Sequence, residues 1–237
     1  MLLNGKSAVI YGAHNPIGAS VAKAFAKAGA TVYLAGRSPS RLQPVANDIR
    51  GAGGAAEVAE VDPLDMHSVS EHLHEVGVQH GTVDVSLNLA FLGIEGATRL
   101  CNLSDEQFDA ATFTRVRSNF VTTAAAVKVM AYQGRGIVLA AAVPEKAAPV
   151  GTMAGQAIGS AAIGALCQQL RLDVGNFGVR IAYIPDVTVT EDDFVEEIFR
   201  VLASLPMASP SPREVLPQTE APSGSAQAEV PAGVATG

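Results

Sequence analysis

The sequence predicts a single doubly wound α/β domain with a parallel sheet of six strands over residues 1–205, followed by a disordered tail over 206–237. Short β-branched runs alternate with helix-length amphipathic stretches, and this alternation builds a parallel sheet covered on both faces by right-handed crossovers. From residue 206 the composition changes to Pro, Ala, Ser, Gly and Glu. Such a segment buries too little apolar surface to offset its ordering entropy.

The elements follow from residue type and periodicity. Strands are expected where β-branched and aromatic residues cluster, at residues 7–12, 31–37, 57–62, 82–90, 136–143 and 179–184. Helices are expected where apolar residues recur at spacings of three and four, at residues 17–28, 41–50, 66–76, 105–132, 156–174 and 192–205. Ser104 is a suitable N-cap for the fourth of these helices. Each strand is therefore followed by a helix, as the parallel sheet requires.

Charge and hydropathy exclude two classes of partner. The net charge of −7 comes with no cluster of lysine or arginine, so the chain lacks the attraction to phosphate backbones that nucleic-acid binding needs. No apolar run approaches the ~20 residues that span a bilayer, and the first strand begins too close to Met1 for a signal peptide. We expect a cytoplasmic protein that binds neither nucleic acid nor membrane.

The cysteines and histidines do not suggest a metal site. Cys101 and Cys167 match no metal or redox spacing, which favours a reducing compartment and inert core thiols. The histidines near the third predicted helix, His67, His72, His74 and His80, include no pair at i and i+4 that faces one ligand. We therefore predict no bound metal.

The turn after the first strand, from Tyr11 to Gly18, has the features of a phosphate-binding turn. Gly12 permits a tight turn, Gly18 permits close approach of helix and strand, and the free amides of the helix favour an anionic pyrophosphate. The spacing resembles the T-G-x-x-x-G-x-G turn of the short-chain dehydrogenase/reductase family, with Tyr11 in place of threonine and Pro16 in place of the middle glycine. A purely structural turn is the alternative.

The resemblance spans about residues 5–205 and implies a Rossmann-type fold with a nicotinamide cofactor. Arg37 ends the second strand, where an arginine accommodates the 2′-phosphate of NADP(H), so NADP(H) is preferred to NAD(H). Further matches are Asp62 after the third strand, Asn88 in a segment similar to N-N-A-G, and Thr190 in a segment similar to P-G-x-x-x-T. The residues predicted to contact the cofactor are Gly12, His14, Asn15, Ile17, Gly18, Arg37, Asp62, Asn88, Ala90 and Thr190.

The same resemblance predicts an unusual catalytic end. The family's reductases use an asparagine, a serine, a tyrosine and a lysine, of which the tyrosine supplies the proton. These four positions are occupied here by Arg115, Val143, Gln156 and Ser160. A shift of one residue for the last three gives Ala142, Gly155 and Gly159. Neither alignment restores the tetrad, and residues 147–182 contain no tyrosine or lysine.

Few groups remain for acid–base work. Glu145 and Lys146 follow the fifth strand, and Arg115 lies on the long helix, but a solvated surface pair and a helix-face arginine are the simpler interpretation. The prediction of altered chemistry depends on Tyr183, Tyr132 and Lys146 lying away from the hydride-bearing carbon. It would be wrong if one of them lay beside it.

The C-terminal end is expected to be truncated relative to the family, since the last helix follows Thr190 almost directly, without a substrate-covering segment or a seventh strand. Three functions remain open. The chain is a reductase of an activated carbonyl, imine or alkene with a non-standard proton source, a catalytically degenerate cofactor- or partner-binding paralogue, or a non-redox lyase, isomerase or cyclase. Alanines on the helices at 105–132 and 156–174 favour a homodimer or homotetramer, although an ordinary core explains them nearly as well.

Overall fold

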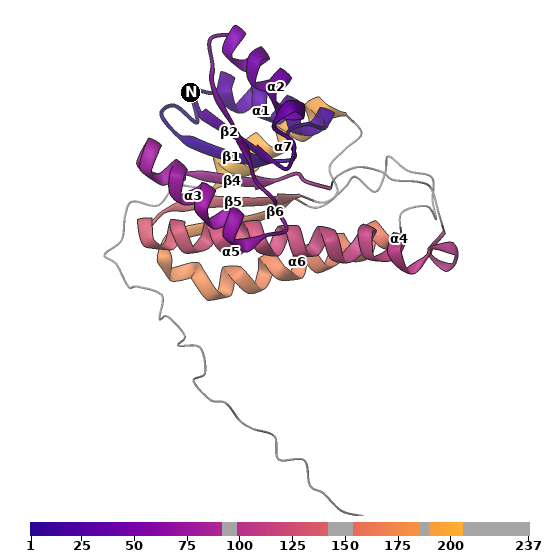
Figure 1. The fold of residues 1–237 in the computed structure, drawn as a ribbon. Coiled ribbons are helices and arrows are strands. Elements are labelled where there is room, and N and C mark those ends of the chain that lie inside the picture. Colours follow the sequence, from indigo (N-terminus) through magenta and orange to yellow (C-terminus); the bar gives the residue numbers. More distant parts are fainter. Residues whose placement is uncertain (92–98, 142–153, 185–189, 206–237) are drawn as a thin grey trace, which may run out of the picture.

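The computed structural model of the 237-residue chain describes residues 1–91, 99–141, 154–184 and 190–205, of which residues 111 and 154–156 are described as backbone only (Figure 1). Val143, Glu145, Lys146 and the predicted tail at 206–237 lie outside the described residues. The same holds for the side chain of Gln156, whose backbone lies in the first turn of a helix that begins at Ala154.

The centre of the fold is a six-stranded sheet with the order β3-β2-β1-β4-β5-β6, in which all pairs are parallel. The strands are β1 (Ser7–Tyr11), β2 (Thr31–Gly36), β3 (Ala55–Glu60), β4 (Val85–Asn88), β5 (Gly136–Ala141) and β6 (Val179–Ile184). The predicted α/β class and the six parallel strands are confirmed. Strand order reverses between β1 and β4, which is where this architecture binds ligands.

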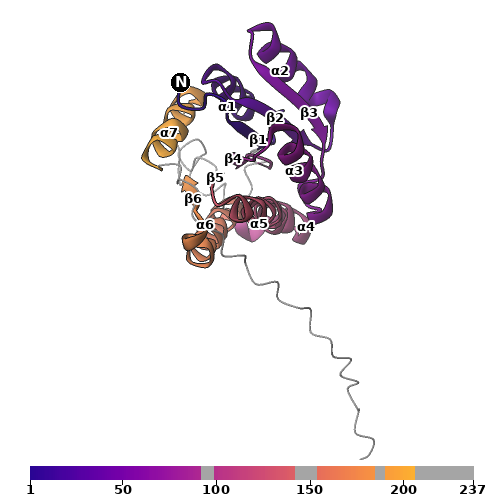
Figure 2. The same cartoon turned by 90° about the vertical axis from the view of Figure 1, so that its left-hand side faces the viewer.

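Helices cover both faces of the sheet, as the view along the strands shows (Figure 2). One face carries α1 (Pro16–Lys27), α2 (Pro39–Gly51) and α7 (Glu191–Ser204). The other carries α3 (Met66–His80), α5 (Arg115–Gln133) and α6 (Ala154–Val174). Each face has its own apolar core, with Phe25 and Phe194 fully buried in the first and Met130 and Ile163 in the second. Within the described ranges, no helix is long and apolar enough to cross a membrane.

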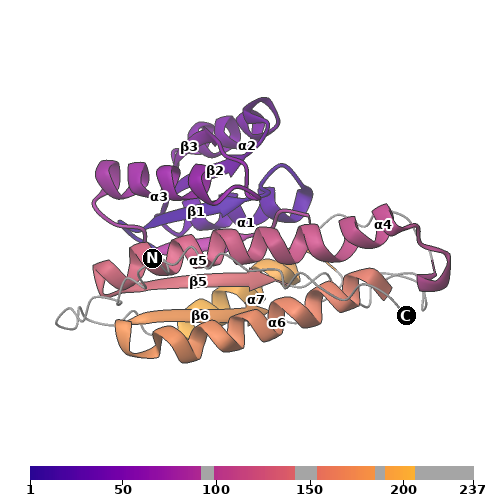
Figure 3. The same cartoon turned by 60° about the horizontal axis from the view of Figure 1, so that its bottom comes forward.

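The helix predicted over residues 105–132 is interrupted. It consists of α4 (Asp105–Asp109), a π-helical turn (Ala110–Thr114) and α5, which together extend beyond the strand ends (Figure 3). The predicted cap is confirmed, because the Ser104 hydroxyl accepts a hydrogen bond from the Gln107 amide. The π turn inserts one residue per turn just before Arg115, and such bulges are frequent at functional sites. Helical periodicity alone did not predict it.

Other boundaries moved by a few residues. Helix α3 continues past the predicted end to His80, where Gly81 takes the left-handed conformation that closes it. Strand β3 begins at Ala55 rather than residue 57, and α2 begins at Pro39 rather than residue 41. Two short 3₁₀ turns, Leu100–Asn102 and Gly175–Phe177, complete the described elements.

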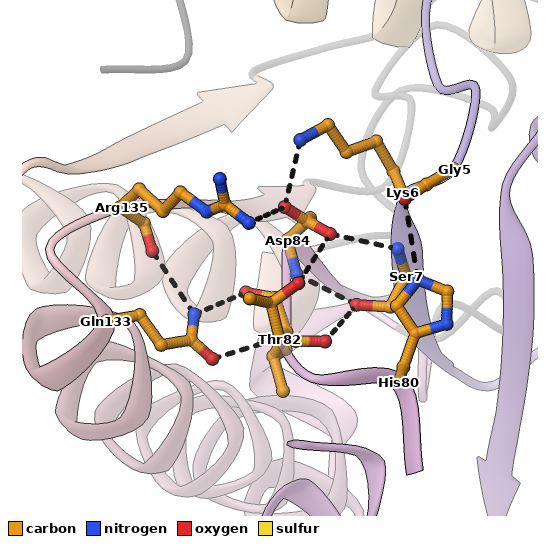
Figure 4. A network of polar contacts seen from close by, with 9 residues as sticks. Gly5, Lys6, Ser7, His80, Thr82, Asp84, Gln133 and Arg135 are labelled. Carbon is orange, nitrogen blue, oxygen red and sulfur yellow. Dashed lines mark hydrogen bonds and ion pairs between the residues drawn. The ribbon is translucent and has the colours of Figure 1, made fainter. Parts of the chain in front are cut away.

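The amino ends of β1, β4 and β5 are joined by a polar network around Asp84 (Figure 4). The Asp84 carboxylate accepts hydrogen bonds from the Ser7 amide at 3.1 Å and the Thr82 hydroxyl at 3.0 Å, and pairs with Lys6 at 3.2 Å and Arg135 at 3.7 Å. The Ser7 hydroxyl donates to the Thr82 carbonyl and accepts from the Asp84 amide. This buried carboxylate is therefore fully partnered.

Candidate active site

The first part of the candidate site is the crevice between the carboxyl ends of β1 and β4. The Leu89 amide donates to the Tyr11 carbonyl at 2.8 Å, so the two strand ends are held side by side where the strand order reverses. The turn that follows β1 and the residues that follow β4 are therefore adjacent. In an open parallel sheet this is the crevice that receives a ligand.

Gly12 and Gly18 are required by space in this crevice. Gly12 has φ +87°, and a Cβ there would lie 2.5 Å from the Ala90 amide nitrogen. A Cβ on Gly18 would lie 2.5 Å from the Gly12 carbonyl oxygen. Both distances are far below van der Waals contact, so neither position tolerates a side chain without a backbone shift. The close packing predicted for the two glycines is present.

Asn15 orders the turn and caps α1. Its side-chain amide donates to the Gly12 carbonyl at 2.7 Å and to the Leu89 carbonyl at 3.1 Å, while its oxygen accepts from the Gly18 amide at 2.7 Å. The residue thus ties β1, β4 and α1 together at the crevice. Pro16 occupies the first turn of α1, where proline costs no hydrogen bond, and Ile17 packs half-buried against the core.

Cationic groups gather beside the crevice. His14 and Arg37, which the sequence predicts to contact the cofactor, are exposed, and the Arg37 guanidinium lies 5.7 Å from the centre of the Phe91 ring. Partial burial lowers the pKa of His14, and the Arg41 and Arg37 cations lower it further to a smaller extent. The hydroxyls of Ser38 and Ser40, at the start of α2, are 3.1 Å apart. Together these groups form a concentration of donors and positive charge that suits a phosphate.

Sequence reasoning missed two of these neighbours, Arg41 and Phe91. Arg41 lies in the first turn of α2, four residues after Arg37, and this spacing could have indicated a second cation near the same site. Phe91 has φ +62°, and among the described residues it is the only non-glycine residue with positive φ. It stands where the family's N-N-A-G has its glycine. A non-glycine residue in this conformation stores strain, which proteins concentrate near functional sites.

Three predicted cofactor ligands make hydrogen bonds within the protein. Asn88 donates to the Ser118 and Thr122 hydroxyls, each at 2.9 Å, and accepts from the Ala90 amide. Thr190 caps α7, with its hydroxyl bonded to Asp193. The Asp62 carboxylate accepts from the Leu64 amide, and the Asp62 backbone amide donates to the Ser68 hydroxyl. A contact between Ser20 and Glu191 at 2.6 Å brings the start of α7 to α1, on the side of the glycine turn.

The second part of the site is a polar layer between the sheet and α5. Strand register aligns Tyr11, Asn88, Ala140 and Tyr183 in one row near the carboxyl ends, so their side chains share the face covered by α5 and α6. Helix α5 packs over this row and presents a buried polar face to it. The residues of this face are Arg115, Ser118, Asn119, Thr122 and Thr123. Buried polar groups in such a layer are normally hydrogen-bonded, and a group without a partner in the protein is a candidate for contact with a ligand.

Arg115 is the most unusual member of this layer. The residue is 2% exposed, and its Nη1 atom lies 3.4 Å from the Ser160 hydroxyl of α6. Among the described residues, its Nε and Nη2 atoms have no hydrogen-bond partner, and no carboxylate forms an ion pair with it. Burial lowers the pKa of this guanidinium. The structure therefore brings together Arg115 and Ser160, at the positions predicted for the family's asparagine and lysine, and buries the arginine.

Tyr183 lies beside this pair. Its hydroxyl donates to the Ser160 carbonyl at 2.8 Å, and its ring packs against Gly164. Burial raises the pKa of the Tyr183 phenol, and the nearby Arg115 cation partly offsets this shift. Tyr132, by contrast, is exposed near the far end of α5. The prediction of altered chemistry depended on where these two tyrosines lie. Tyr183 lies at the carboxyl end of the sheet, and its place near the end of the predicted sixth strand already indicated this.

The helices predicted to associate with other copies expose small side chains. On α6, Ala157, Ala161 and Ala165 are exposed at helical spacing, and Leu172 is exposed beyond them. On α5, Ala125 and Ala126 are buried in the core, whereas Phe120 is exposed. The homo-oligomer stays a prediction.

Comparison with known proteins identifies relatives over most of the chain. The family model described as short chain dehydrogenase matches residues 6–196. A short chain dehydrogenase of Pseudocercospora fijiensis is 34% identical over 114 residues, which cover 48% of this chain and 35% of that protein. The chain thus matches only about a third of this relative's length. A 3alpha-hydroxysteroid dehydrogenase of Mediterraneibacter gnavus is 28% identical over 81% of this chain and 77% of its own.

Solved structures give the same fold. A metagenomic short-chain oxidoreductase in complex with NADP superposes with a TM-score of 0.73 at 21% identity, covering 91% of this chain and 96% of its own. A hydroxysteroid dehydrogenase from Escherichia coli superposes with a TM-score of 0.67 at 25% identity, covering 77% of this chain and 72% of its own. The first of these likenesses concerns the fold alone.

Proposed function

The chain belongs to the short-chain dehydrogenase family of oxidoreductases, and from this premise we propose that it binds NADP(H) and reduces an activated carbonyl, imine or alkene with a proton from a non-standard source. The nicotinamide, when bound, supplies the hydride that goes to the electrophilic carbon of the substrate. A proton must then reach the heteroatom or the adjacent carbon. The residues of this chain bind the cofactor, hold the substrate and supply or relay that proton.

The observation that carries the proposal is the turn at the reversal of strand order. Gly12 and Gly18 have no room for a Cβ, and Asn15 makes three hydrogen bonds that order the turn, one of them to the Leu89 carbonyl that follows β4. A loop built this tightly at the start of α1 lets backbone amides approach a pyrophosphate.

The cationic groups around Arg37 support NADP(H) over NAD(H). The 2′-phosphate of NADP(H) is the feature that distinguishes the two cofactors, and arginine binds phosphate through paired donors. His14, Arg37 and Arg41 are close enough for the two arginines to lower the pKa of the histidine. A bound phosphate would relieve this mutual repulsion, whereas NAD(H) would leave it in place.

The proton source is the unusual part of the proposal. If the family's tyrosine position is Gln156 and its lysine position Ser160, as the alignment predicts, neither side chain is the usual acid. Tyr183 is a protonated phenol at this end of the sheet, since burial raises its pKa. Tyr183, Glu145, water or the substrate itself would supply the proton. Loss of a dedicated general acid costs about two to four orders of magnitude in rate, not all activity.

A catalytically silent binding protein is the second candidate. It is favoured by the internal hydrogen bonds of Asn88 and Thr190, whose polar atoms are already used within the chain. In this case the cofactor or a partner binds without hydride transfer. Binding and turnover have to be measured separately to distinguish the two candidates.

Fluorescence titration with NADPH and NADH tests the proposal. We expect saturable binding with a preference for NADPH, and we expect Arg37→Ser to weaken NADPH about tenfold through the lost charge-assisted contacts, with little effect on NADH. Arg200→Ser, which removes an exposed arginine on α7, is the matched control. Absence of binding at high micromolar concentrations of both cofactors would refute the proposal. Binding without turnover on a panel of carbonyls, imines and enones would favour the silent binder.

A further inference from the structure

We propose that Arg115 is a carboxylate-binding residue and that the substrate of this protein is a monoanion whose carboxylate pairs with the buried guanidinium. The inference rests on the proposed function in one respect, namely that the bound carboxylate belongs to the substrate. The pairing itself follows from the unsatisfied state of Arg115. It names a class of substrate for a site whose substrate is otherwise open.

The first step is the cost of the arginine as it stands. A guanidinium removed from water is stable only when its charge and donors are matched, and an unmatched buried cation is strongly unfavourable. Arg115 is 2% exposed, yet the described residues offer it one long contact, from Nη1 to the Ser160 hydroxyl at 3.4 Å. The protein therefore carries a cost at Arg115 that it avoids at Asp84, whose buried charge is matched.

The second step is the geometry of the free donors. The unpartnered nitrogens are Nε and Nη2, which lie along one edge of the planar guanidinium. Their N–H bonds point in the same direction and match the two oxygens of a carboxylate in a bidentate pair. Ser160 engages the third nitrogen and so helps to fix the plane.

The third step is charge and location. A single positive charge with two free donors balances one carboxylate, whereas a phosphate dianion would require further cations or donors. Arg115 begins α5, one turn before Asn119. Further along the same helix, the Ser118 and Thr122 hydroxyls accept hydrogen bonds from Asn88 at the end of β4, so the guanidinium is at the carboxyl end of the sheet. This is the end at which ligands of such sheets bind.

Other unpartnered polar atoms lie in the same layer. Asn119 Oδ1 and the Tyr11 hydroxyl have no partner, and with the two Arg115 nitrogens they make four of the five such buried atoms in the described part of the chain. Asn119 Oδ1 is an acceptor and suits a hydroxyl or a water rather than the carboxylate itself. Buried unsatisfied groups are rare and each requires an explanation, and a ligand bound in this layer would account for several of them together.

The experiment measures the thermal unfolding midpoint of the full chain in low-chloride buffer. The ligands are acetate, malonate or benzoate, and the controls are the neutral acetamide, malonamide and benzamide. Inorganic phosphate is tested as a second kind of anion. We expect at least one carboxylate to raise the midpoint in a saturable manner and its amide to have no effect, because a ligand that binds the native state stabilises it. Arg115→Met should weaken the effective carboxylate about 30-fold or more, since it removes a charged hydrogen-bonded pair. Arg115→Lys should retain part of the response, because it keeps the charge and loses the bidentate edge.

Several outcomes would overturn the proposal: no response to any carboxylate, an equal response to the amides, a response to phosphate alone, or an undiminished response in Arg115→Met. The variant Glu145→Gln tests whether a carboxylate of the chain itself pairs with Arg115. A response to added carboxylates that appears only in this variant would show such a pair and would also overturn the proposal. NADPH titration of the same variants separates this proposal from the proposed function. Carboxylate binding without NADPH binding would refute only the latter, and NADPH binding without a carboxylate response would refute only the former.

Discussion

The two ends of the sheet differ in how their buried charged side chains are partnered. At the amino ends, the Asp84 carboxylate is 1% exposed and is matched by two cations, a backbone amide and a hydroxyl (Figure 4). At the carboxyl ends, the Arg115 guanidinium is 2% exposed, and two of its nitrogens have no hydrogen-bond partner among the residues that the structure describes. The first arrangement is complete within the chain, and we propose that a bound carboxylate completes the second.

This difference separates structural from functional polarity. A satisfied buried network stabilises and fixes the packing of strands, as the Asp84 network does for β1, β4 and β5. An unsatisfied group costs stability and persists where function requires it. Burial alone does not distinguish the two ends. The count of missing hydrogen bonds does.

Removal of the carboxylate at the amino end is expected to have the largest effect on stability. Asp84→Ala leaves the buried Ser7 amide without its acceptor and two cations without their anion, and should lower the free energy of unfolding by about 3 kcal/mol or more. Urea denaturation measures it. Asp48→Ala, which breaks an exposed pair with Lys23, is the control and should cost less than about 1 kcal/mol. Similar losses in both variants would remove the structural role assigned to the network.

The glycine turn at the carboxyl end should respond next most strongly. Gly12→Ala combines a left-handed conformation with a Cβ 2.5 Å from the Ala90 amide, so we expect a loss of about 2 kcal/mol and at least tenfold weaker NADPH binding. Gly77→Ala, in α3 with open space around its Cβ, is the matched control and should stabilise the protein by about 0.5–1 kcal/mol. Unchanged NADPH affinity in a folded Gly12→Ala protein would contradict the role of the turn.

A smaller effect is expected from the buried histidine of α3. His72 is 6% exposed against the Tyr33 ring, and burial lowers its pKa below the ordinary value, with Glu75 acting weakly in the opposite direction. The unfolded chain therefore binds the proton more readily, so stability from this group is present above about pH 6.5 and falls as the pH decreases, by at most about 1.4 kcal/mol per pH unit.

Urea denaturation between pH 7.5 and 5 should reveal this slope, and His72→Leu should reduce it. The exposed His74 on the same helix provides the control variant His74→Gln, which should leave the slope unchanged. His14, whose pKa is also lowered, contributes a slope of the same sign that remains in both variants. A slope that is identical in the wild type and His72→Leu would show that this histidine is not the titrating group.

Sequence predicted the regular parts of the molecule well because they depend on local periodicity. Strand β6 has the predicted bounds, and the Ser104 cap, the two glycines of the turn and the six parallel strands are present as expected. The π turn before Arg115 was not predicted, since one inserted residue leaves the pattern of apolar positions on either side almost unchanged.

The polar layer could not be predicted because it depends on contacts between distant segments. An arginine on a helix with mixed polarity resembles a surface residue, yet α6 and β6 bury Arg115 from the other side. Tyr183 follows the strand pattern, but its contact with the Ser160 carbonyl requires the packing of β6 under α6. The Asp84 network joins residues that are more than 70 positions apart in the sequence, and periodicity cannot predict such contacts either.

The contrast between the two ends is tested most directly by the free energy of unfolding of Arg115→Met in ligand-free, low-salt buffer. Methionine retains most of the length of the side chain and removes the unmatched charge, so the variant should be more stable than the wild type, by about 1–4 kcal/mol. A loss of stability comparable with that of Asp84→Ala would mean that Arg115 is a satisfied structural residue, and the carboxyl end would then hold no vacant site for an anion.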